Sequence, residues 1–276
     1  MIARIAITAT PAPPRPAPLL LYGDLAGAFR QAAGFGCQGV EIHLRCAEDI
    51  EVGAVKHLAE EYAMGIPTLG TGMAAGDGLS FSDPDPVVRA HAVERVEGHI
   101  GAAAELGAAV TIGTLSGKLG PCRGDERRSR RARALESLAD VCRRAARAAV
   151  TVLLEPLNRY ECDYINTLAD AVAIAAEIGA PNLRLLADTF HMNIEEIDLA
   201  ASLRAAGRLI GHVHLADTNR RAPGHGHLDV ARVLAALDDI GYEGYLSFEV
   251  LPLPDAAAAI RDGIDTVHAA MRLSVV

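Results

Sequence analysis

The sequence predicts an α/β fold, a (β/α)8 TIM barrel formed by a single domain over residues 1–276. Short apolar runs alternate along the chain with Ala-rich amphipathic stretches, which is the pattern of α/β proteins. The length of 276 residues suits an eight-stranded barrel, which typically takes about 250 residues as one unit. Four runs in the C-terminal half each end on a residue able to bind a divalent metal, at the spacing of one strand plus one helix.

Eight runs are predicted to form the strands of the barrel. Each is short, rich in aliphatic residues and bounded by glycine, proline or polar residues. In chain order they are Ile2–Thr8, Gly39–His43, Gly65–Thr68, Ala109–Gly113, Val150–Glu155, Leu183–Asp188, Leu209–His214 and Gly244–Glu249.

Eight helices are predicted in the segments between these strands and after the last of them. The start of the third helix is the clearest, because Asp85 suits an N-cap and Pro86 the first helical position. No change in composition marks a second domain. The expected helices lie near Leu25–Gly34, Val52–Ala63, Pro86–Leu106, Glu126–Ala149, Leu168–Ile178, Ile197–Ala206, Val230–Ile240 and Ala256–Leu273.

The last four predicted strands end on Glu155, Asp188, His214 and Glu249, with spacings of 33, 26 and 35 residues. All strands of a parallel barrel point the same way, so side chains at these ends converge on one mouth, where barrel active sites lie. Three carboxylates and one imidazole form a hard ligand set, which favours Mn²⁺ first, with Co²⁺ or Mg²⁺ as alternatives. The sequence therefore predicts a divalent metal site.

The net charge indicates which partners to expect, and the cysteine content indicates which compartment. The net charge of −9 gives no positive field to attract nucleic acid or an anionic membrane, so we expect neither. The basic run over residues 123–133 contains two acidic residues and opens a helix, which favours a solvated face or a subunit contact in a homo-oligomer. Five cysteines without a Cys-x-x-Cys pair, and no apolar N-terminal run long enough for a signal peptide, favour the reducing cytoplasm.

Three polar residues follow the predicted ligands at short distances. His191 comes three residues after Asp188, and Glu161 and Arg220 each come six residues after a predicted ligand. Each alone could be an ordinary loop residue. Together they predict a pocket for a hydroxylated, carbonyl-bearing substrate. Two other histidines are expected to be structural: His43 in the pocket wall or core, and His212 facing away from His214 or lying deeper.

Several strings of the second half resemble the metal-dependent sugar isomerase/epimerase barrels (the xylose isomerase-like family) that include D-tagatose and D-psicose 3-epimerases. They are EPLNRYE, INT, ADTFHMNIEE, GHVHLADTNR and SFE. Longer strings, among them TGMAAGDGLSFSDPD, HLADTNRRAPGHGHLD and LPLPD, look more like the 5-keto-L-gluconate epimerase branch. The chain departs from that pattern at LSGK, where Ser116 stands in place of an expected arginine.

The resemblance implies an epimerase that inverts the carbon next to the carbonyl of a ketose or a keto-sugar acid. In that scheme a divalent metal stabilises an enediolate, and Glu155 and Glu249 are the two acid–base groups, one on each face of the substrate. His191 and Arg220 would stabilise charge on the carbonyl oxygen, and Glu161 would bind the substrate's hydroxyl groups.

The sequence does not decide whether the substrate is charged, and it is compatible with other activities. If the substrate carries a distal carboxylate, Lys118 is the predicted partner, because it follows the fourth predicted strand at the barrel mouth; Arg45 and Arg159 are alternatives. Rival enzymes are an aldose–ketose isomerase resembling hydroxypyruvate isomerase, and an inosose dehydratase. A barrel nuclease would need histidines that the third and fourth strand ends lack. The non-enzymatic alternative is a metal-dependent sugar-binding barrel.

Overall fold

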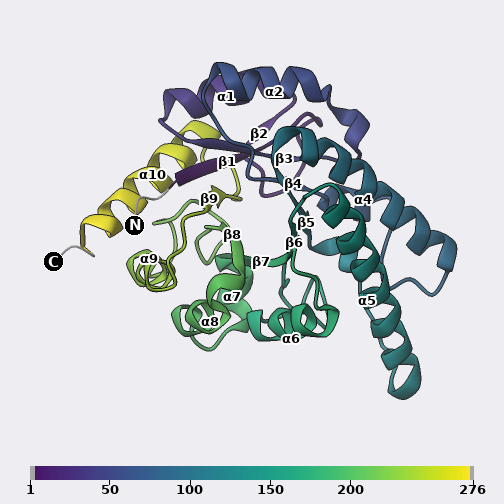
Figure 1. Cartoon of the computed structure of the whole chain (residues 1–276). Helices are drawn as coiled ribbons and strands as arrows, with labels where there is room; N and C mark the ends of the chain where they lie inside the picture. Colours follow the sequence, from purple (N-terminus) through teal and green to yellow (C-terminus); the bar gives the residue numbers. More distant parts are fainter. Residues whose placement is uncertain (1–3, 274–276) are drawn as a thin grey trace.

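The computed structural model describes residues 4–273, which form a closed barrel of parallel strands surrounded by helices (Figure 1). Eight strands make the barrel wall, and β1 pairs with β9 to close it. They are β1 (Arg4–Thr10), β3 (Gly39–His43), β4 (Thr68–Gly70), β5 (Ala109–Ile112), β6 (Val152–Leu154), β7 (Leu183–Asp188), β8 (Ile210–His214) and β9 (Tyr245–Phe248). The predicted (β/α)8 fold is confirmed.

Eight longer helices follow the barrel strands and cover the outside of the barrel (Figure 1). The Pro86 start is as predicted, with the Asp85 carboxylate accepting a hydrogen bond from the amide of Val87 at 2.8 Å. Of the described helices, none is long and apolar enough to cross a membrane. The eight are α1 (Leu25–Gly34), α2 (Val52–Glu61), α4 (Pro86–Leu106), α5 (Gly124–Arg147), α6 (Leu168–Ile178), α8 (Leu199–Ala206), α9 (Val230–Asp239) and α10 (Ala256–Leu273).

Several short elements lie between these units and were not predicted. The two-residue strand β2 (Leu21–Tyr22) pairs in parallel with the end of β1. Two short helices and three 3-10 turns complete the described elements: α3 (Gly72–Ala75), α7 (Thr189–Glu195), η1 (Ala47–Asp49), η2 (Thr114–Ser116) and η3 (Gly207–Leu209).

The third barrel strand lies later in the chain than predicted. Gly65 makes only an isolated bridge to Gly39, and regular pairing begins at Thr68. Pro67 separates the two because it has no amide hydrogen to donate to the ladder. At the N-terminus, Ile2 and Ala3 of the first predicted strand lie outside the described residues.

The barrel interior holds a polar layer beneath the mouth. Glu41 on β3 and His212 on β8 are buried and hydrogen-bonded to each other, although their strands are not neighbours. Both side chains therefore point into the barrel. His212 takes the deeper of its two predicted positions, beneath the strand end at His214.

Candidate metal and active site

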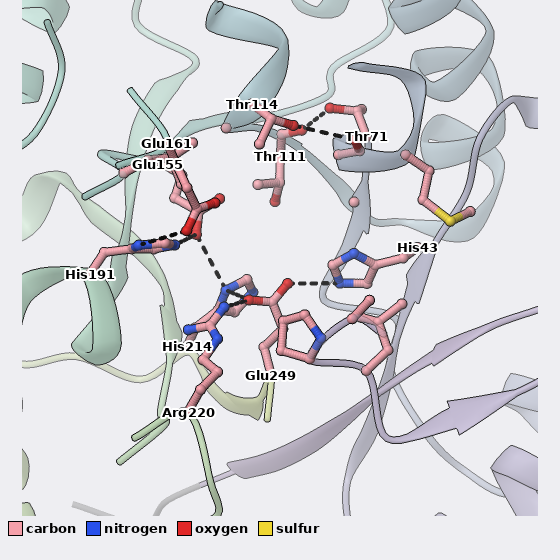
Figure 2. Close-up of a pocket in the computed structure, with 18 of the residues that line it drawn as sticks. His43, Thr71, Thr111, Thr114, Glu155, Glu161, His191, His214, Arg220 and Glu249 are labelled. Carbon is pink, nitrogen blue, oxygen red and sulfur yellow. Dashed lines mark hydrogen bonds and ion pairs between the residues drawn. The ribbon is translucent and has the colours of Figure 1, made fainter. Parts of the chain in front are cut away.

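Four strand ends bring Glu155, Asp188, His214 and Glu249 together, with one donor atom of each within 4.8 Å of the others. The Nδ1 atom of His214 lies 3.6 Å from Glu155 Oε1, 3.5 Å from Asp188 Oδ2 and 3.3 Å from Glu249 Oε2. Asp188 and His214 are the last residues of β7 and β8, whereas the two glutamates directly follow β6 and β9. The glutamates therefore come from the two outermost of four consecutive strands. Figure 2 shows both carboxylates close to His214.

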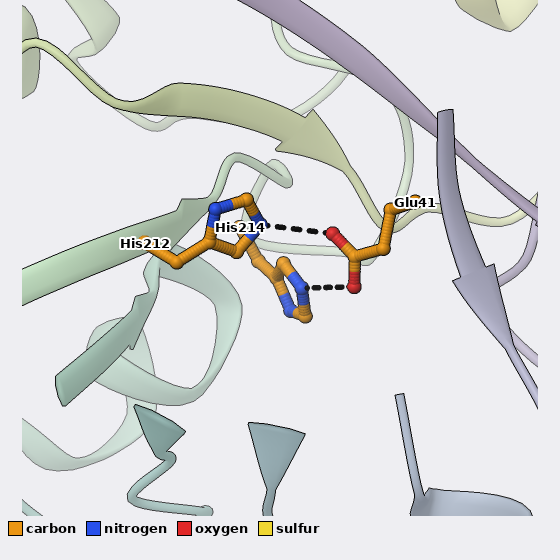
Figure 3. Close-up of side chains that lie close together, drawn as sticks. All are labelled: Glu41, His212 and His214. Atoms are coloured by element: carbon orange, nitrogen blue, oxygen red, sulfur yellow. Dashed lines mark hydrogen bonds and ion pairs between the residues drawn. The ribbon is translucent and has the colours of Figure 1, made fainter. Parts of the chain in front are cut away.

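Glu41 holds His214 from below (Figure 3). Its Oε1 atom accepts hydrogen bonds from Nε2 of His214 at 2.9 Å and of His43 at 3.0 Å, and Oε2 accepts from Nε2 of His212 at 2.8 Å. Burial alone would raise the pKa of Glu41, but His214 and His212 outweigh it and hold that pKa well below its usual range. An ionised carboxylate only accepts, so Nε2 of His214 is the donor and Nδ1 faces the other three ligands.

The donor set fits a divalent cation. His214 Nδ1 is buried and has no hydrogen-bond partner, which is costly for a polar atom unless something else satisfies it. Three carboxylates surround that nitrogen, and Glu41 fixes the ring by the outer hydrogen bond that metal-binding histidines usually make. Glu155, Asp188, His214 and Glu249 could therefore hold the ion.

The pKa values of the cluster show how its negative charge is balanced. Burial raises the pKa of Glu155. Burial would do the same for Asp188 and Glu249, but Arg220 and neighbouring histidines outweigh it and lower both pKa values. For His214, burial favours the neutral form, yet the carboxylates of Glu41 and Glu249 prevail and raise its pKa well above the usual value. Without a metal, His214 and Arg220 thus supply the compensating positive charge.

Arg220 is fixed on a strained backbone beside the cluster. Its guanidinium donates to Asp188 Oδ2 and Glu249 Oε2 and lies 4.8 Å from the centroid of the Phe190 ring. Its φ of 61° is in the left-handed region, where residues other than glycine are uncommon and often functional. The Arg220 amide donates to the Asp217 carbonyl at 2.9 Å, and the Arg220 carbonyl accepts from the Leu251 amide at 2.8 Å.

His191 reaches the site from α7, where a loop was predicted. Nδ1 of His191 accepts hydrogen bonds from the Asn158 side-chain amide at 2.8 Å and the Asn158 backbone amide at 3.3 Å. Its proton is therefore on Nε2, which lies 4.0 Å from Glu155 Oε1 and 3.9 Å from Asp188 Oδ2. The Asn158 amide also donates to Glu161 at 2.9 Å, so this one residue orients both.

A cavity opens above the cluster, lined in part by threonines from the loops after β4 and β5 (Figure 2). The hydroxyls of Thr71 and Thr114 donate to backbone carbonyls, and Thr114, which is partly exposed, keeps its oxygen free to accept from a ligand hydroxyl. Gly113 leaves room for Glu155, because a Cβ at that position would lie 2.5 Å from Glu155 Oε2.

The structure brings seven of the eight predicted site residues together, and the exception is Lys118. The Lys118 side chain is exposed, its Nζ donates to the Tyr160 carbonyl at 3.0 Å, and the residue does not line the cavity. Its direction follows from the chain turn at Gly117, whose φ is 80°. The prediction that Lys118 holds a distal carboxylate is wrong about its position. The cavity instead contains Arg15 from the loop after β1.

The sequence predictions missed Glu41, Asn158 and Arg15 as functional candidates, and also Thr114 in the cavity wall. Glu41 is not among the sequence predictions, although it lies two residues before His43, which does lie in the cavity wall as predicted. Asn158 lies inside the EPLNRYE string, where its proximity to Glu161 was the available signal. Arg15 gave no signal, because it lies in a Pro-rich loop without periodicity.

Comparisons with known proteins find relatives and solved structures that are named as sugar epimerases. The L-ribulose 3-epimerase of Methylomonas sp. (strain DH-1) is 33% identical over 236 residues, which are 84% of this chain and 82% of that protein. The structure of D-allulose 3-epimerase from Methylomonas sp. in complex with D-allulose has a TM-score of 0.80 and 26% identity, with 97% and 98% of the two chains covered. The 3-keto-D-glucoside 4-epimerase of E. coli has a TM-score of 0.79 and 27% identity, with 97% and 100% covered.

The family profile gives the broadest match. The profile of the family described as xylose isomerase-like TIM barrel matches residues 29–269, which include all four residues of the metal-binding cluster. The chain belongs to the xylose isomerase-like TIM barrel family.

Proposed function

We propose that this protein is an isomerase, a metal-dependent epimerase that inverts the carbon next to the carbonyl of a ketose or keto-sugar acid. The observation that carries the proposal is the pair of carboxylates of Glu155 and Glu249, which face one cavity from the two ends of a four-strand donor cluster. The similar proteins named above are a ketose 3-epimerase, an allulose 3-epimerase and a keto-glucoside 4-epimerase, which supports the same class of reaction.

The residues that would hold the cation are Glu155, Asp188, His214 and Glu249, and their hard donor set favours Mn²⁺, with Co²⁺ or Mg²⁺ also compatible. When bound, such an ion supplies positive charge that stabilises the negative oxygens formed during proton removal.

The two glutamates then act as the base and the acid. One carboxylate removes the proton from the carbon next to the carbonyl, and the bonding electrons move to the carbonyl oxygen to give an enediolate. The other glutamate starts protonated and gives its proton to the opposite face of that carbon as the electron pair returns from the oxygen, so the configuration inverts without a redox change. Exchange with solvent then restores the proton on one glutamate and removes it from the other. His191 presents Nε2–H and Arg220 its guanidinium toward the same space, where both can stabilise the developing oxyanion.

The cavity wall suits a polyol. The free acceptor position of Thr114, together with the Glu161 carboxylate, can accept hydrogen bonds from substrate hydroxyls. Glu161 is oriented by Asn158 and is the more exposed of the cavity's carboxylates, with 45% of its side chain accessible. It would therefore bind the substrate without taking part in proton transfer.

Binding of Mn²⁺ to the metal-free protein near neutral pH is expected to release about one proton. The raised pKa of His214 keeps its Nδ1 protonated in the folded, metal-free protein, and that proton must leave before the nitrogen can act as a ligand. Calorimetric titration in buffers of different ionisation enthalpy measures the release. Release should disappear as the pH rises through the folded pKa of His214, and in His214→Asn. An absence of release near neutral pH would count against His214 as a ligand.

The function itself is tested by incubating the Mn²⁺-loaded protein with L-ribulose, D-allulose and a set of keto-hexuronates, and separating the products by chromatography. We expect at least one substrate to give its epimer at the carbon next to the carbonyl. A strong chelator should stop the reaction, and Mn²⁺ or Co²⁺ should restore it better than Zn²⁺. Formation of an aldose, or no conversion of any substrate, would overturn the proposal.

A further inference from the structure

We propose that Arg15 is a specificity-determining residue that binds an anionic group of the substrate, a carboxylate or a phosphate, at the end remote from the reacting carbon. This inference rests on the proposed function and adds the substrate class that the site prefers. The charged side chains that line the cavity are the observation behind it.

Three carboxylates line the cavity and would repel a negatively charged substrate. They belong to Glu155, Glu161 and Glu249. Two arginines line the same cavity. Arg220 is already engaged, since its guanidinium donates to Asp188 and Glu249. The guanidinium of Arg15 has no hydrogen-bond or ion-pair partner among residues 4–273. Arg15 is thus the lining arginine that remains free to bind a ligand.

The backbone that carries Arg15 is held in place. Arg15 stands between Pro14 and Pro16 in a loop with five prolines from position 11 to position 18, and each proline ring fixes one φ angle. The Tyr22 hydroxyl lies 3.1 Å from the Arg15 carbonyl, to which it can donate, and 3.0 Å from the Ala17 carbonyl.

Tyr22 in turn belongs to β2, which pairs with the end of β1 (Figure 1). The loop is therefore fixed at both ends, and Leu19 and Leu20 are buried beside it. Holding the backbone in advance lowers the entropy cost of binding, which then falls only on the arginine side chain.

The guanidinium of Arg15 favours an anionic ligand over a neutral one. Its planar fork matches the two oxygens of a carboxylate or a phosphate, and such charge-assisted hydrogen bonds are roughly twice as strong as neutral ones. A neutral sugar hydroxyl can accept from Arg15 but gains no charge assistance. The proposal therefore requires a difference between charged and neutral substrates, and a general loss of activity would not support it.

The test compares Arg15→Ala, Arg15→Lys and the control Lys118→Ala, all loaded with Mn²⁺. Lys118 is a matched cation, because it is exposed, lies at the same end of the barrel and does not line the cavity. Each protein is assayed with a neutral ketohexose, a keto-hexuronate and a ketohexose phosphate. The two charged substrates distinguish a carboxylate from a phosphate as the preferred group.

Arg15→Ala should raise KM for the preferred charged substrate by about 10-fold or more, the effect of losing one charge-assisted hydrogen bond. The kcat should change little, because the contact is remote from the reacting carbon. Arg15→Lys should recover part of the loss, Lys118→Ala should show none, and the effect of Arg15→Ala should shrink at high salt.

Three results would overturn the inference: equal KM changes for neutral and charged substrates, no change for any, or an equal effect of Lys118→Ala. A wild-type protein that inverts neutral ketoses and neither charged substrate would also overturn it while leaving the proposed epimerase standing. If the wild-type protein inverts no substrate at all, the proposed function fails and this inference fails with it.

Discussion

Glu155→Gln and Glu249→Gln are each expected to lower epimerisation by at least about 100-fold, within the range that positioned acid–base groups contribute. In the proposed mechanism each change removes the carboxylate that serves one face of the substrate and leaves an amide that cannot take the proton. Both side chains are nearly buried next to His214, so glutamine keeps their size and shape. The measurement is kcat at saturating Mn²⁺ with the bound metal verified, together with thermal unfolding to show that the fold persists.

Glu161→Gln is the matched control, because it removes a carboxylate from the same cavity that is half-exposed and lies outside the four-ligand cluster. It should raise KM and leave most of kcat. More than about a tenth of wild-type activity in either Glu155→Gln or Glu249→Gln would contradict the two-base mechanism.

Glu41→Gln is expected to weaken Mn²⁺ binding by roughly 10- to 100-fold, the usual effect of losing the outer partner of a metal-binding histidine. Among the four predicted ligands, Glu41 bonds directly to His214, whose Nε2 it holds at 2.9 Å, and it also accepts from His43, whose Nε2 lies 3.8 Å from Glu249 Oε1. With an amide in its place, one of the three imidazoles must give up its acceptor, and the uncharged oxygen that remains holds the others less strongly than the carboxylate does. The dissociation constant is read by calorimetric titration, so the result does not depend on turnover.

Glu196→Gln serves as the control for this variant. Its carboxylate accepts from the Leu168 amide and the Ser202 hydroxyl, both at 2.7 Å, and none of these residues lines the cavity. The metal affinity of this variant should equal that of the wild type. A Glu41→Gln protein that binds Mn²⁺ as tightly as the wild type would show that Glu41 does not position His214.

Most of the barrel could be predicted from sequence because strand and helix signals alternate with a regular period. The cluster of Glu155, Asp188, His214 and Glu249 could be predicted for the same reason, because the C-terminal ends of parallel barrel strands lie at one mouth. Strand boundaries were less accurate where local chemistry interrupts the ladder, as Pro67 does before β4.

The loops could not be predicted in this way. Lys118 and Arg15 both follow barrel strands and are both exposed, yet Lys118 donates to the Tyr160 carbonyl and Arg15 lines the cavity. The difference depends on a positive φ at Gly117 and on the hydrogen bonds of Tyr22, which leave no periodic trace in the sequence. Glu41 was missed for another reason: a fully buried carboxylate is rare, and its three imidazole partners become apparent only when the barrel closes.

Proton exchange between the two glutamates and opposite faces of one carbon can be followed by turnover in D₂O. The Mn²⁺-loaded protein is incubated with an accepted substrate, and product and remaining substrate are analysed by NMR at early times, before the reverse reaction contributes. The two-base mechanism predicts one deuterium in the product, at the inverted carbon, and none in the remaining substrate. Product that retains its original hydrogen at that carbon, or deuterium at the carbon on the other side of the carbonyl, would contradict the mechanism.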